Sequence, residues 1–245
     1  GKRCFAEYNL GFLQDMRRFL KSDEDMVPAV QYRIRHNPDD HGVINYITCQ
    51  DGFTLNDLVS YNYKHNEANG EGNNDGCSYN YSWNCGIEGP SRMRAAFAMM
   101  LFSQGVPMIY GGDEIGNSQK GNNNAYCQDN SIGWIDWRGL RRNASMLAFV
   151  KKAVALRKAH PVLHMSESMK EADYLGKGFP DMSFHGERAW FCNMENTSRM
   201  IGVMLCGAYA KLPDGSEDDF LYTGYNFHWE TRNIALPNLP EGMEW

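Results

Sequence analysis

Two apolar runs in this sequence end in carboxylates beside glycines, and these carboxylates are the groups best placed for chemistry. Residues 43–48 (VINYIT) are apolar and mostly β-branched, and Asp51 follows them, directly before a glycine. Residues 107–110 (PMIY) lead into two glycines and then Asp113 and Glu114. Parallel sheets and barrels hold reactive groups just past the carboxyl ends of their strands. Asp51 can equally cap the turn or helix after it, because aspartate is a common cap.

Two polar segments follow these carboxylates and have the composition of a sugar-binding surface. Residues 62–90 are rich in asparagine and glycine, and residues 117–130 contain three consecutive asparagines. Amides offer paired donors and acceptors for hydroxyl groups, and aromatic rings offer apolar faces for stacking. A connection as long as 62–90 is either functional or disordered. Its Tyr79, Tyr81 and Trp83 argue against disorder, since disordered segments contain few aromatics.

The elements that position these groups follow from hydrophobic spacing. Residues 4–9 and 43–48 have the length and composition of strands, and 12–20 places its apolar residues at helical spacing. Arg17 is expected on the opposite, polar face of that helix. The segment 22–41 is charged and contains two prolines, so we expect a loop with at most one short helix. Strand, helix and strand in this order predict a parallel sheet of βαβ type.

The second half of the chain changes character after Pro161. Helices are expected at 92–104 and 145–159, with a strand at 107–110 between them. Short apolar or alternating runs separated by turn residues then predict an antiparallel β-sandwich. We therefore expect two domains, residues 1–161 and residues 162–245. The expected strands of the second domain are 189–193, 201–205, 220–227 and 233–236.

Composition excludes several classes of protein. The 245 residues carry a net charge of −6, which disfavours nucleic acid as a partner because phosphate neutralisation needs clustered Lys and Arg. No apolar run approaches the length of a membrane span. The seven cysteines are scattered without a Cys-x-x-Cys pair, so we expect no zinc site, no other metal or cofactor, and a reducing cytoplasm. The sequence lacks an initiator Met and a signal peptide, so we expect a portion of a longer protein.

Three stretches together resemble the isoamylase-type glycogen debranching enzymes of the α-amylase superfamily of glycoside hydrolases. They are INYITCQDGFTLNDLVSYNYKHNEANGEGNNDG at 44–76, SYNYSWNCGIEGP just after it, and SQGVPMIYGGDEIGNSQKGNNNAYCQDNSIGWIDW at 103–137. The resemblance covers nearly the whole chain and includes the order of the motifs. It implies the carboxyl-terminal part of a (β/α)₈ barrel, about strands 6–8, followed by an incomplete antiparallel β-sandwich.

The resemblance also implies roles for particular residues. The family cleaves glycosidic bonds by a retaining mechanism with three carboxylates, a nucleophile, a general acid/base and a transition-state stabiliser. Only the stabiliser has a counterpart here, Asp51; we reject Glu7 as the acid, because it lies in the segment that follows the family's acid. The isolated chain is therefore expected to be inactive. The expected substrate is a branched α-glucan, glycogen or a limit dextrin. The expected substrate-binding residues are Gln50, Trp83, Asp113, Glu114, Asn124, Tyr126 and Asp129.

Several of these roles have alternatives. The family usually has His where this chain has Gln50, and an amide can donate a hydrogen bond but cannot carry charge. This departure keeps open a non-catalytic glucan-binding or scaffold protein, and an α-1,4-glucan hydrolase of the same superfamily is a further alternative. Trp83 can simply pack within its loop. Asp113 and Glu114 can bond to loop amides instead of substrate.

A partial barrel has a physical consequence of its own. A barrel lacks sheet edges only because it closes, and about three of eight strands leave an open edge. Exposed edges promote association, so self-association through this edge is expected.

Overall fold

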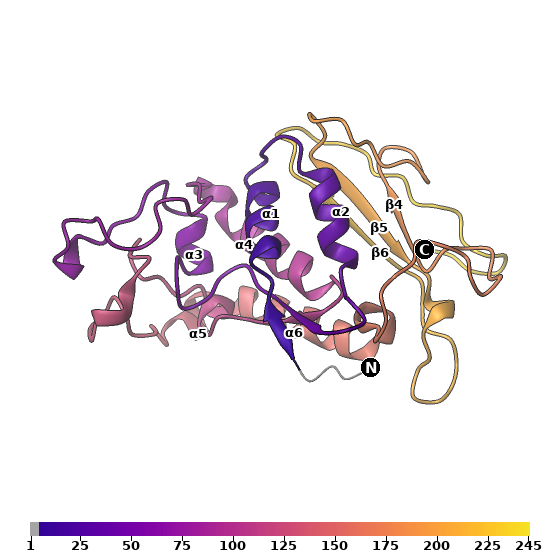
Figure 1. The fold of residues 1–245 in the computed structure, drawn as a ribbon, viewed down its shortest axis with the longest axis horizontal. Coiled ribbons are helices and arrows are strands. Elements are labelled where there is room, and N and C mark those ends of the chain that lie inside the picture. Colours follow the sequence, from indigo (N-terminus) through magenta and orange to yellow (C-terminus); the bar gives the residue numbers. More distant parts are fainter. Residues whose placement is uncertain (1–4) are drawn as a thin grey trace.

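The computed structural model describes residues 5–245, and it contains two sheets with helices between and around them (Figure 1). The first sheet is parallel, with the strands in chain order: β1 (Ala6–Tyr8), β2 (Gly42–Asn45) and β3 (Val106–Pro107). These strands fall where strands were expected, but all three are shorter. Residues 46–48 remain buried after leaving the sheet. The expected start of the first strand at Cys4 lies outside the described residues.

The helices that cover the parallel sheet owe their form to buried apolar stripes. In α1 (Leu10–Leu20) the side chain of Asn9 accepts a hydrogen bond from the Phe12 backbone N–H at 3.1 Å and caps the helix. Phe12 and Phe19 are completely buried. The other helices of at least eight residues are α2 (Val27–Arg35), α4 (Gly89–Leu101) and α6 (Ala144–Ala159).

Short helical elements occupy the connections. The α-helical ones are α3 (Leu55–Leu58) and α5 (Gly139–Arg142). The 3₁₀ turns are Glu67–Asn69, Gly86–Glu88, Asp113–Ile115, Ala125–Cys127, Pro161–His164 and Gly207–Tyr209.

Helix α2 is more substantial than expected for the segment 22–41. Its proline, Pro28, lies in the first turn, where the missing N–H would have no intrahelical partner anyway. Val27, Val30 and Ile34 are buried and give the helix its apolar face. The segment therefore contains a helix of nine residues, with Pro28 in its first turn and Pro38 beyond its end.

The second sheet is antiparallel and contains β4 (Met182–His185), β5 (Met200–Leu205) and β6 (Leu221–Asn226), with β5 in the centre. Two of the expected strands correspond to β5 and β6. The other two expectations were wrong: residues 189–193 contribute only to an isolated bridge between Arg188 and Phe191, and 233–236 form no strand. Strand β4 was missed because its alternation of apolar and polar residues (MSFH) covers only four positions, and all four are buried in the structure.

The expected sandwich is also corrected, because the described residues after 161 form one sheet and not two stacked ones. Helices of the first half take the place of a second sheet, and one hydrophobic core contains residues from α1, α4 and β5 alike. Phe19 and Phe227 meet edge to face with ring centroids 4.9 Å apart. The two halves are therefore packed against one another.

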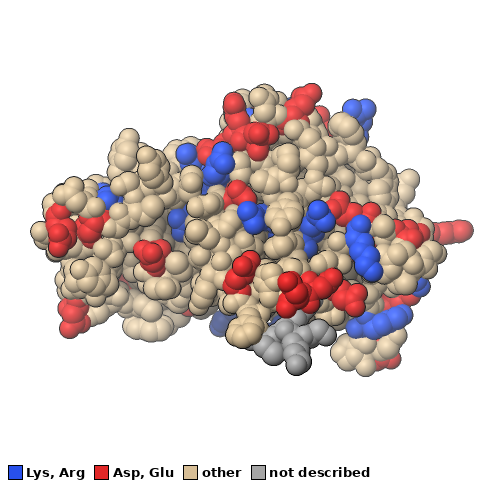
Figure 2. All heavy atoms as spheres, in the orientation of Figure 1, with Lys and Arg blue, Asp and Glu red and all other residues tan. Residues whose placement is uncertain are grey.

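Acidic and basic side chains are interspersed over the face shown in Figure 2. Within the described part of the chain, no helix combines the length and the apolar character that crossing a bilayer requires.

Candidate functional site

Asp51 lies just past the carboxyl end of β2, on an exposed turn. Gln50 and Asp51 are both exposed, and the Asp51 carboxylate makes no hydrogen bond or ion pair with another described residue. Gly52 has φ +125°, a conformation that side chains rarely adopt, and its N–H donates to the Asn123 carbonyl at 3.0 Å. The glycine thus turns the chain and ties the carboxylate's turn to the loop of 117–130.

Asp51 does not cap the helix that follows. Thr54 is the N-cap of α3, and its hydroxyl accepts a hydrogen bond from the Asp57 N–H at 3.2 Å. The alternative interpretation of Asp51 as the cap of this helix was therefore wrong. Its carboxylate remains available for a ligand.

Asp113, by contrast, is a buried structural group with 2% exposure. Its carboxylate accepts hydrogen bonds from the Thr48 hydroxyl and from the Leu55 N–H, the latter at 2.8 Å. Burial raises its pKa to about 7, against the lowering effect of these two bonds. The structure therefore matches the alternative of a loop-bonding Asp113. Glu114 is partly buried and accepts a hydrogen bond from the Gly112 N–H at 2.9 Å.

Arg17 is buried beside the Asp51 turn and bonds to the strand end that precedes it. It was not among the expected site residues. The arginine was expected on the polar face of α1, but it is 4% exposed. Its Nε donates to the Ile47 carbonyl at 2.7 Å and its Nη1 to the Asn80 carbonyl at 3.0 Å. Burial lowers its pKa to about 10, so it stays charged at neutral pH. Its spacing of four residues from the buried Leu13 was the signal that could have placed it near the apolar stripe.

The two polar loops fold onto one another through paired side-chain amides. Asn66 and Asn123 are completely buried: Asn66 Nδ2 donates to Asn123 Oδ1 at 2.8 Å, and the Asn123 N–H donates to Asn66 Oδ1 at 2.9 Å. Asn123 Nδ2 also donates to the Cys77 carbonyl at 2.7 Å and to Asn80 Oδ1 at 2.8 Å. Many amides that the composition suggested for sugar binding are thus used to hold the loops together.

The buried carboxylate of Asp57 fixes the start of the second loop. It accepts hydrogen bonds from the Ser118 hydroxyl at 2.5 Å, the Gln119 N–H at 2.8 Å and the Gly121 N–H at 3.2 Å. Desolvation raises the pKa of this carboxyl, and these bonds oppose the rise. Asp57 was not among the expected site residues, although it holds the start of the loop whose Asn123 carbonyl contacts the Asp51 turn.

The other residues that were expected to contact a ligand are either hydrogen-bonded to protein groups or exposed to solvent. Asn124 Nδ2 donates to Asp75 Oδ2 at 2.9 Å, and exposed Asp129 accepts from Trp134 Nε1 at 2.9 Å. Tyr126 is 81% exposed and Trp83 is 37% exposed. The Arg92 guanidinium lies 5.5 Å from the centroid of the Trp83 ring, so one neighbour of this ring is already a protein group. The loops therefore present aromatic rings to solvent more than free amides.

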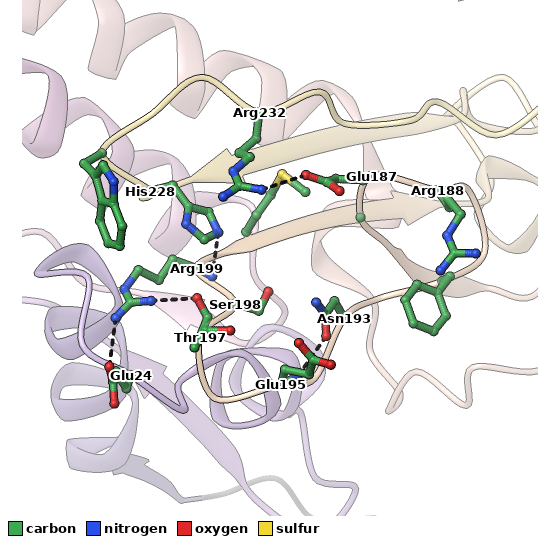
Figure 3. A pocket seen from close by; sticks show the side chains of 14 residues that line it. Glu24, Glu187, Arg188, Asn193, Glu195, Thr197, Ser198, Arg199, His228 and Arg232 are labelled. Carbon is green, nitrogen blue, oxygen red and sulfur yellow. Dashed lines mark hydrogen bonds and ion pairs between the residues drawn. The ribbon is translucent and has the colours of Figure 1, made fainter.

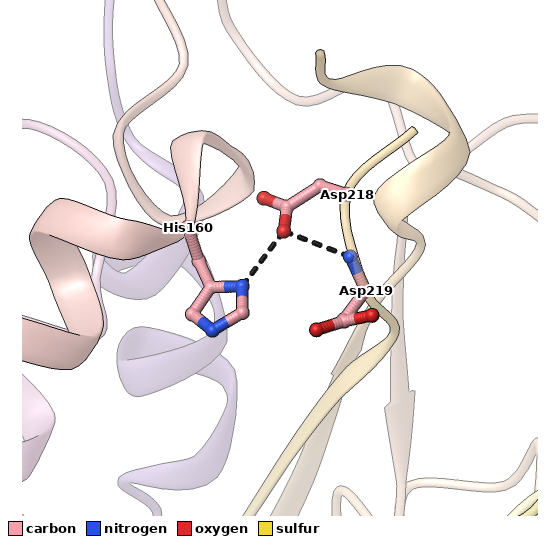
Figure 4. A group of neighbouring side chains, drawn as sticks. All are labelled: His160, Asp218 and Asp219. Carbon is pink, nitrogen blue, oxygen red and sulfur yellow. Dashed lines mark hydrogen bonds and ion pairs between the residues drawn. The ribbon is translucent and has the colours of Figure 1, made fainter. Parts of the chain in front are cut away.

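One group of metal-ligating side chains occurs in the described residues, far along the chain from these loops: His160, Asp218 and Asp219 (Figure 4). Asp218 is fully occupied by protein donors. It bonds to His160 Nδ1 at 2.7 Å, to the Val162 N–H at 3.0 Å and to the Asp219 N–H at 2.8 Å. These contacts join the end of α6 to the second sheet, which gives the group a structural role.

Comparisons with known proteins show which proteins this chain is similar to in sequence. No family model matches the chain. It is 40% identical over 229 residues to the glycogen operon protein GlgX homolog of Mycobacterium bovis, covering 82% of this chain and 31% of that protein. It is 39% identical over 264 residues to the glycogen debranching enzyme of Pectobacterium carotovorum, covering 98% of this chain and 39% of that enzyme. The chain thus spans between three and four tenths of the length of these relatives.

Solved structures show the same architecture at lower identity. The pullulanase of Paenibacillus barengoltzii in complex with maltohexaose and α-cyclodextrin superposes with a TM-score of 0.61 at 20% identity, covering 90% of this chain and 31% of that one. The pullulanase of Anoxybacillus sp. LM18-11 gives a TM-score of 0.61 at 19% identity, covering 94% and 32%. At such identities the likeness bears on the fold alone.

Proposed function

The chain belongs to the isoamylase-type glycogen debranching enzymes of the α-amylase superfamily, and on this premise we propose that it is the part of an α-1,6-glucan hydrolase that contributes the transition-state stabiliser Asp51. The substrate of the complete protein is a branched α-glucan, glycogen or a limit dextrin. In this proposal β1, β2 and β3 are the sixth to eighth strands of the catalytic barrel, and residues 162–245 are its carboxyl-terminal β domain. The parallel pairing of the three strands in chain order supports this assignment.

The observation that carries the proposal is the setting of Asp51. Its exposed carboxylate stands at the carboxyl end of a parallel strand, and the Gly52 N–H joins its turn to the loop that carries Asn124 and Tyr126. Arg17 holds the strand end from the buried side through the Ile47 carbonyl. A carboxylate held in this way can accept hydrogen bonds from sugar hydroxyls and strengthen them as the ring distorts in the transition state.

The other residues have narrower roles in the proposal. Gln50, beside Asp51, donates an amide hydrogen bond to a sugar hydroxyl. Exposed Tyr126 and Trp83 offer ring faces to glucose units, and Asn124, Asp129 and Glu114 supply polar contacts at the rim. Asp113 keeps the segment between Thr48 and Leu55 in place and does not touch substrate. The nucleophile and the general acid/base have no counterpart in this chain.

Replacing Asp51 in the complete protein tests the proposal. In Asp51→Ala, kcat for release of reducing ends from a branched glucan should fall by about 10³-fold or more, because a preorganised transition-state contact is lost. Asp214→Asn is the matched control, since Asp214 is an exposed carboxylate outside the barrel strands that bonds only to Ser216, and its activity should be unchanged. Pullulan and linear glucans serve as parallel substrates. Cleavage of linear glucans alone would replace the α-1,6 assignment with an α-1,4-glucan hydrolase.

A non-catalytic glucan-binding protein is the second candidate, and Gln50 is the observation that favours it. Gln cannot become charged beside the reacting sugar, so it stabilises the transition state less than the family's His. If the complete protein binds glucan but releases no reducing ends, this candidate replaces the enzyme. The 245-residue chain alone should show no hydrolysis in either case, because two of the three catalytic carboxylates lack a counterpart in it.

A further inference from the structure

A hollow lies at the junction of the two halves, well away from the polar loops. Figure 1 shows the loops of 62–85 at one end of the long axis and the β4–β6 sheet at the other. The hollow has a volume of about 520 Å³ and lies between the segments 186–200 and 228–232, with Glu24 of the α1–α2 turn closing one side (Figure 3). Its size is within the range of small-ligand sites.

Aromatic rings stand at both ends of this junction pocket. Figure 3 shows Arg188 and Arg199 at opposite ends, and each guanidinium lies over a ring. The Arg188 Cζ atom is 4.8 Å from the Phe191 centroid, and the Arg199 Cζ atom is 5.4 Å from the Trp229 centroid. The rings remain 51% and 80% exposed, so each still offers surface for stacking.

Arg199 is held rigidly at the Trp229 end of the junction pocket. Its side chain is nearly buried, with Nε donating to the Ser22 carbonyl at 2.7 Å and Nη1 to the Thr197 carbonyl at 2.6 Å. Its Nη2 lies 3.5 Å from a Glu24 carboxylate oxygen. The guanidinium beside the Trp229 ring is therefore held in place by several directed bonds, and it loses little conformational freedom when a ligand binds.

The charges that line the pocket balance. Its three arginines, Arg188, Arg199 and Arg232, face three carboxylates, and Arg232 pairs with Glu187 at 3.3 Å. A surplus of either sign would select an ionic ligand of the opposite sign. Alternating donors and acceptors between two rings instead suit a neutral ligand with many hydroxyl groups and apolar faces.

His228, in the pocket wall, leaves this charge balance unchanged. Its Nε2 accepts a hydrogen bond from the Arg199 N–H at 3.2 Å, and burial together with nearby Arg232 and Arg199 lowers its pKa. The neutral ring therefore carries its proton on Nδ1, which is buried and has no partner among the described residues. Because this atom is shielded from solvent, a ligand in the pocket does not reach it, and the ring adds neither charge nor a free donor to the site.

We propose that the junction pocket is a second α-glucan-binding site, in which two glucose-bearing segments of one chain stack on Trp229 and Phe191. The choice of glucan among polyhydroxylated ligands rests on the proposed function. The site does not hydrolyse the polymer; it holds a large substrate on the protein. Binding at two places on one molecule raises the effective concentration of the polymer at the Asp51 turn.

Maltoheptaose binding to the 245-residue chain, followed by isothermal titration calorimetry, tests this site directly. Trp229→Ala should weaken binding about tenfold, since loss of one stacking platform is worth roughly 1.4 kcal/mol. Phe191→Ala should weaken it in the same direction. Both rings are half exposed or more, so thermal unfolding of the variants should match that of the parent chain. Trp137→Ala is the control, an exposed tryptophan that belongs to neither proposed binding surface; Trp83→Ala reports on binding by the polar loops.

Each outcome decides the proposal. Weaker binding in Trp229→Ala with unchanged binding in Trp137→Ala supports it. Loss in Trp83→Ala alone would confine binding to the polar loops and overturn the second site while leaving the proposed function standing. Equal binding in all variants, or no binding by the parent chain, would also overturn it. Hydrolysis by the complete protein is independent of these results, so failure of the proposed function is recognised separately.

Discussion

Asp113 illustrates how burial decides the chemistry of a carboxyl group at the scale of a single residue. Asp113 and Asp51 both follow a parallel strand, but Asp51 is exposed and Asp113 has 2% exposure. Removing a carboxylate from water favours its neutral form, and two hydrogen bonds only partly compensate. The pKa of Asp113 is therefore about 7, against 3.8 for an ordinary aspartate.

This shift predicts a pH dependence of stability. Between pH 4 and 7 the native Asp113 holds a proton that the unfolded chain has lost, so the free energy of unfolding falls as pH rises through this window and levels off above it. In Asp113→Asn this fall should be absent. The free energy of unfolding of the variant minus that of the parent chain should therefore be up to about 4 kcal/mol higher at pH 8 than at pH 4. Urea unfolding at a series of pH values measures the difference.

The Asn side chain can still accept from the Leu55 N–H and can donate to the Thr48 hydroxyl, so the variant should fold. Asp129→Asn serves as the control, because Asp129 is exposed. Parallel pH curves for the parent chain and Asp113→Asn would show that the buried carboxyl does not titrate in this range.

The sequence predicted the position of Asp51 but not that of Arg17, and the difference has a physical reason. Asp51 was found because its strand and glycine form a local pattern. Arg17 was misplaced because its partners, the Ile47 and Asn80 carbonyls, are distant in sequence. Local spacing identifies which groups stand at a strand end, but it does not show which long side chain is drawn inward to satisfy a buried carbonyl.

At the scale of elements, the site depends on loops that have little regular structure of their own. Residues 62–80 and 121–124 are joined by side-chain amides instead of backbone ladders, with Asn123 at the centre of the network. Buried polar groups are costly unless they are paired, and a fully satisfied network fixes one arrangement. The composition of these loops predicted sugar contacts, whereas the structure shows that much of it serves loop pairing.

Asn123→Ala should therefore loosen both loops. The side chain makes three hydrogen bonds, with Asn66 Nδ2, the Cys77 carbonyl and Asn80 Oδ1. Its removal leaves Asn80 Oδ1 without a partner, whereas Asn66 Nδ2 and the Cys77 carbonyl each keep another hydrogen bond. We expect the free energy of unfolding to fall by about 2–3 kcal/mol and proteolysis within 62–80 to become faster. Urea unfolding and timed limited proteolysis measure the two effects.

Asn74→Ala is the matched control within the same loop. Its exposed Nδ2 donates only to the Glu71 carbonyl, at 3.0 Å, so the change should stay within about 0.5 kcal/mol. Unchanged proteolysis in Asn123→Ala would mean that the loops are held by other contacts.

At the scale of the whole molecule, packing between the halves replaced the expected sandwich. The core runs from α1 and α4 into β5, and Arg199, Ser22 and Phe227 bridge the junction by hydrogen bonds. The sequence after 161 showed short strands but not what would cover them. The missing information is the pairing of distant surfaces, which periodicity within one segment does not contain.

The parallel sheet, however, has two strands with only one neighbour each, β1 and β3. Near β1 the side chains of Phe5, Tyr8 and Leu10 are 82%, 62% and 54% exposed. Unpaired backbone groups beside exposed apolar side chains favour pairing with another chain. The 245-residue chain should therefore self-associate as its concentration rises, which size-exclusion chromatography with light scattering measures.

A charged side chain on the edge strand β1 should reverse the self-association of the chain. Tyr8→Lys places an ammonium group on β1, and desolvating it in a strand-to-strand contact is unfavourable, so the mean mass should return toward that of one chain. Tyr126→Lys carries the same change at a more exposed tyrosine on the polar loop and should leave association unaltered. A parent chain that stays monomeric at high concentration would mean that the short strand β1 is itself sufficient protection. If both lysine variants dissociate the chain, net charge and not the sheet edge controls association.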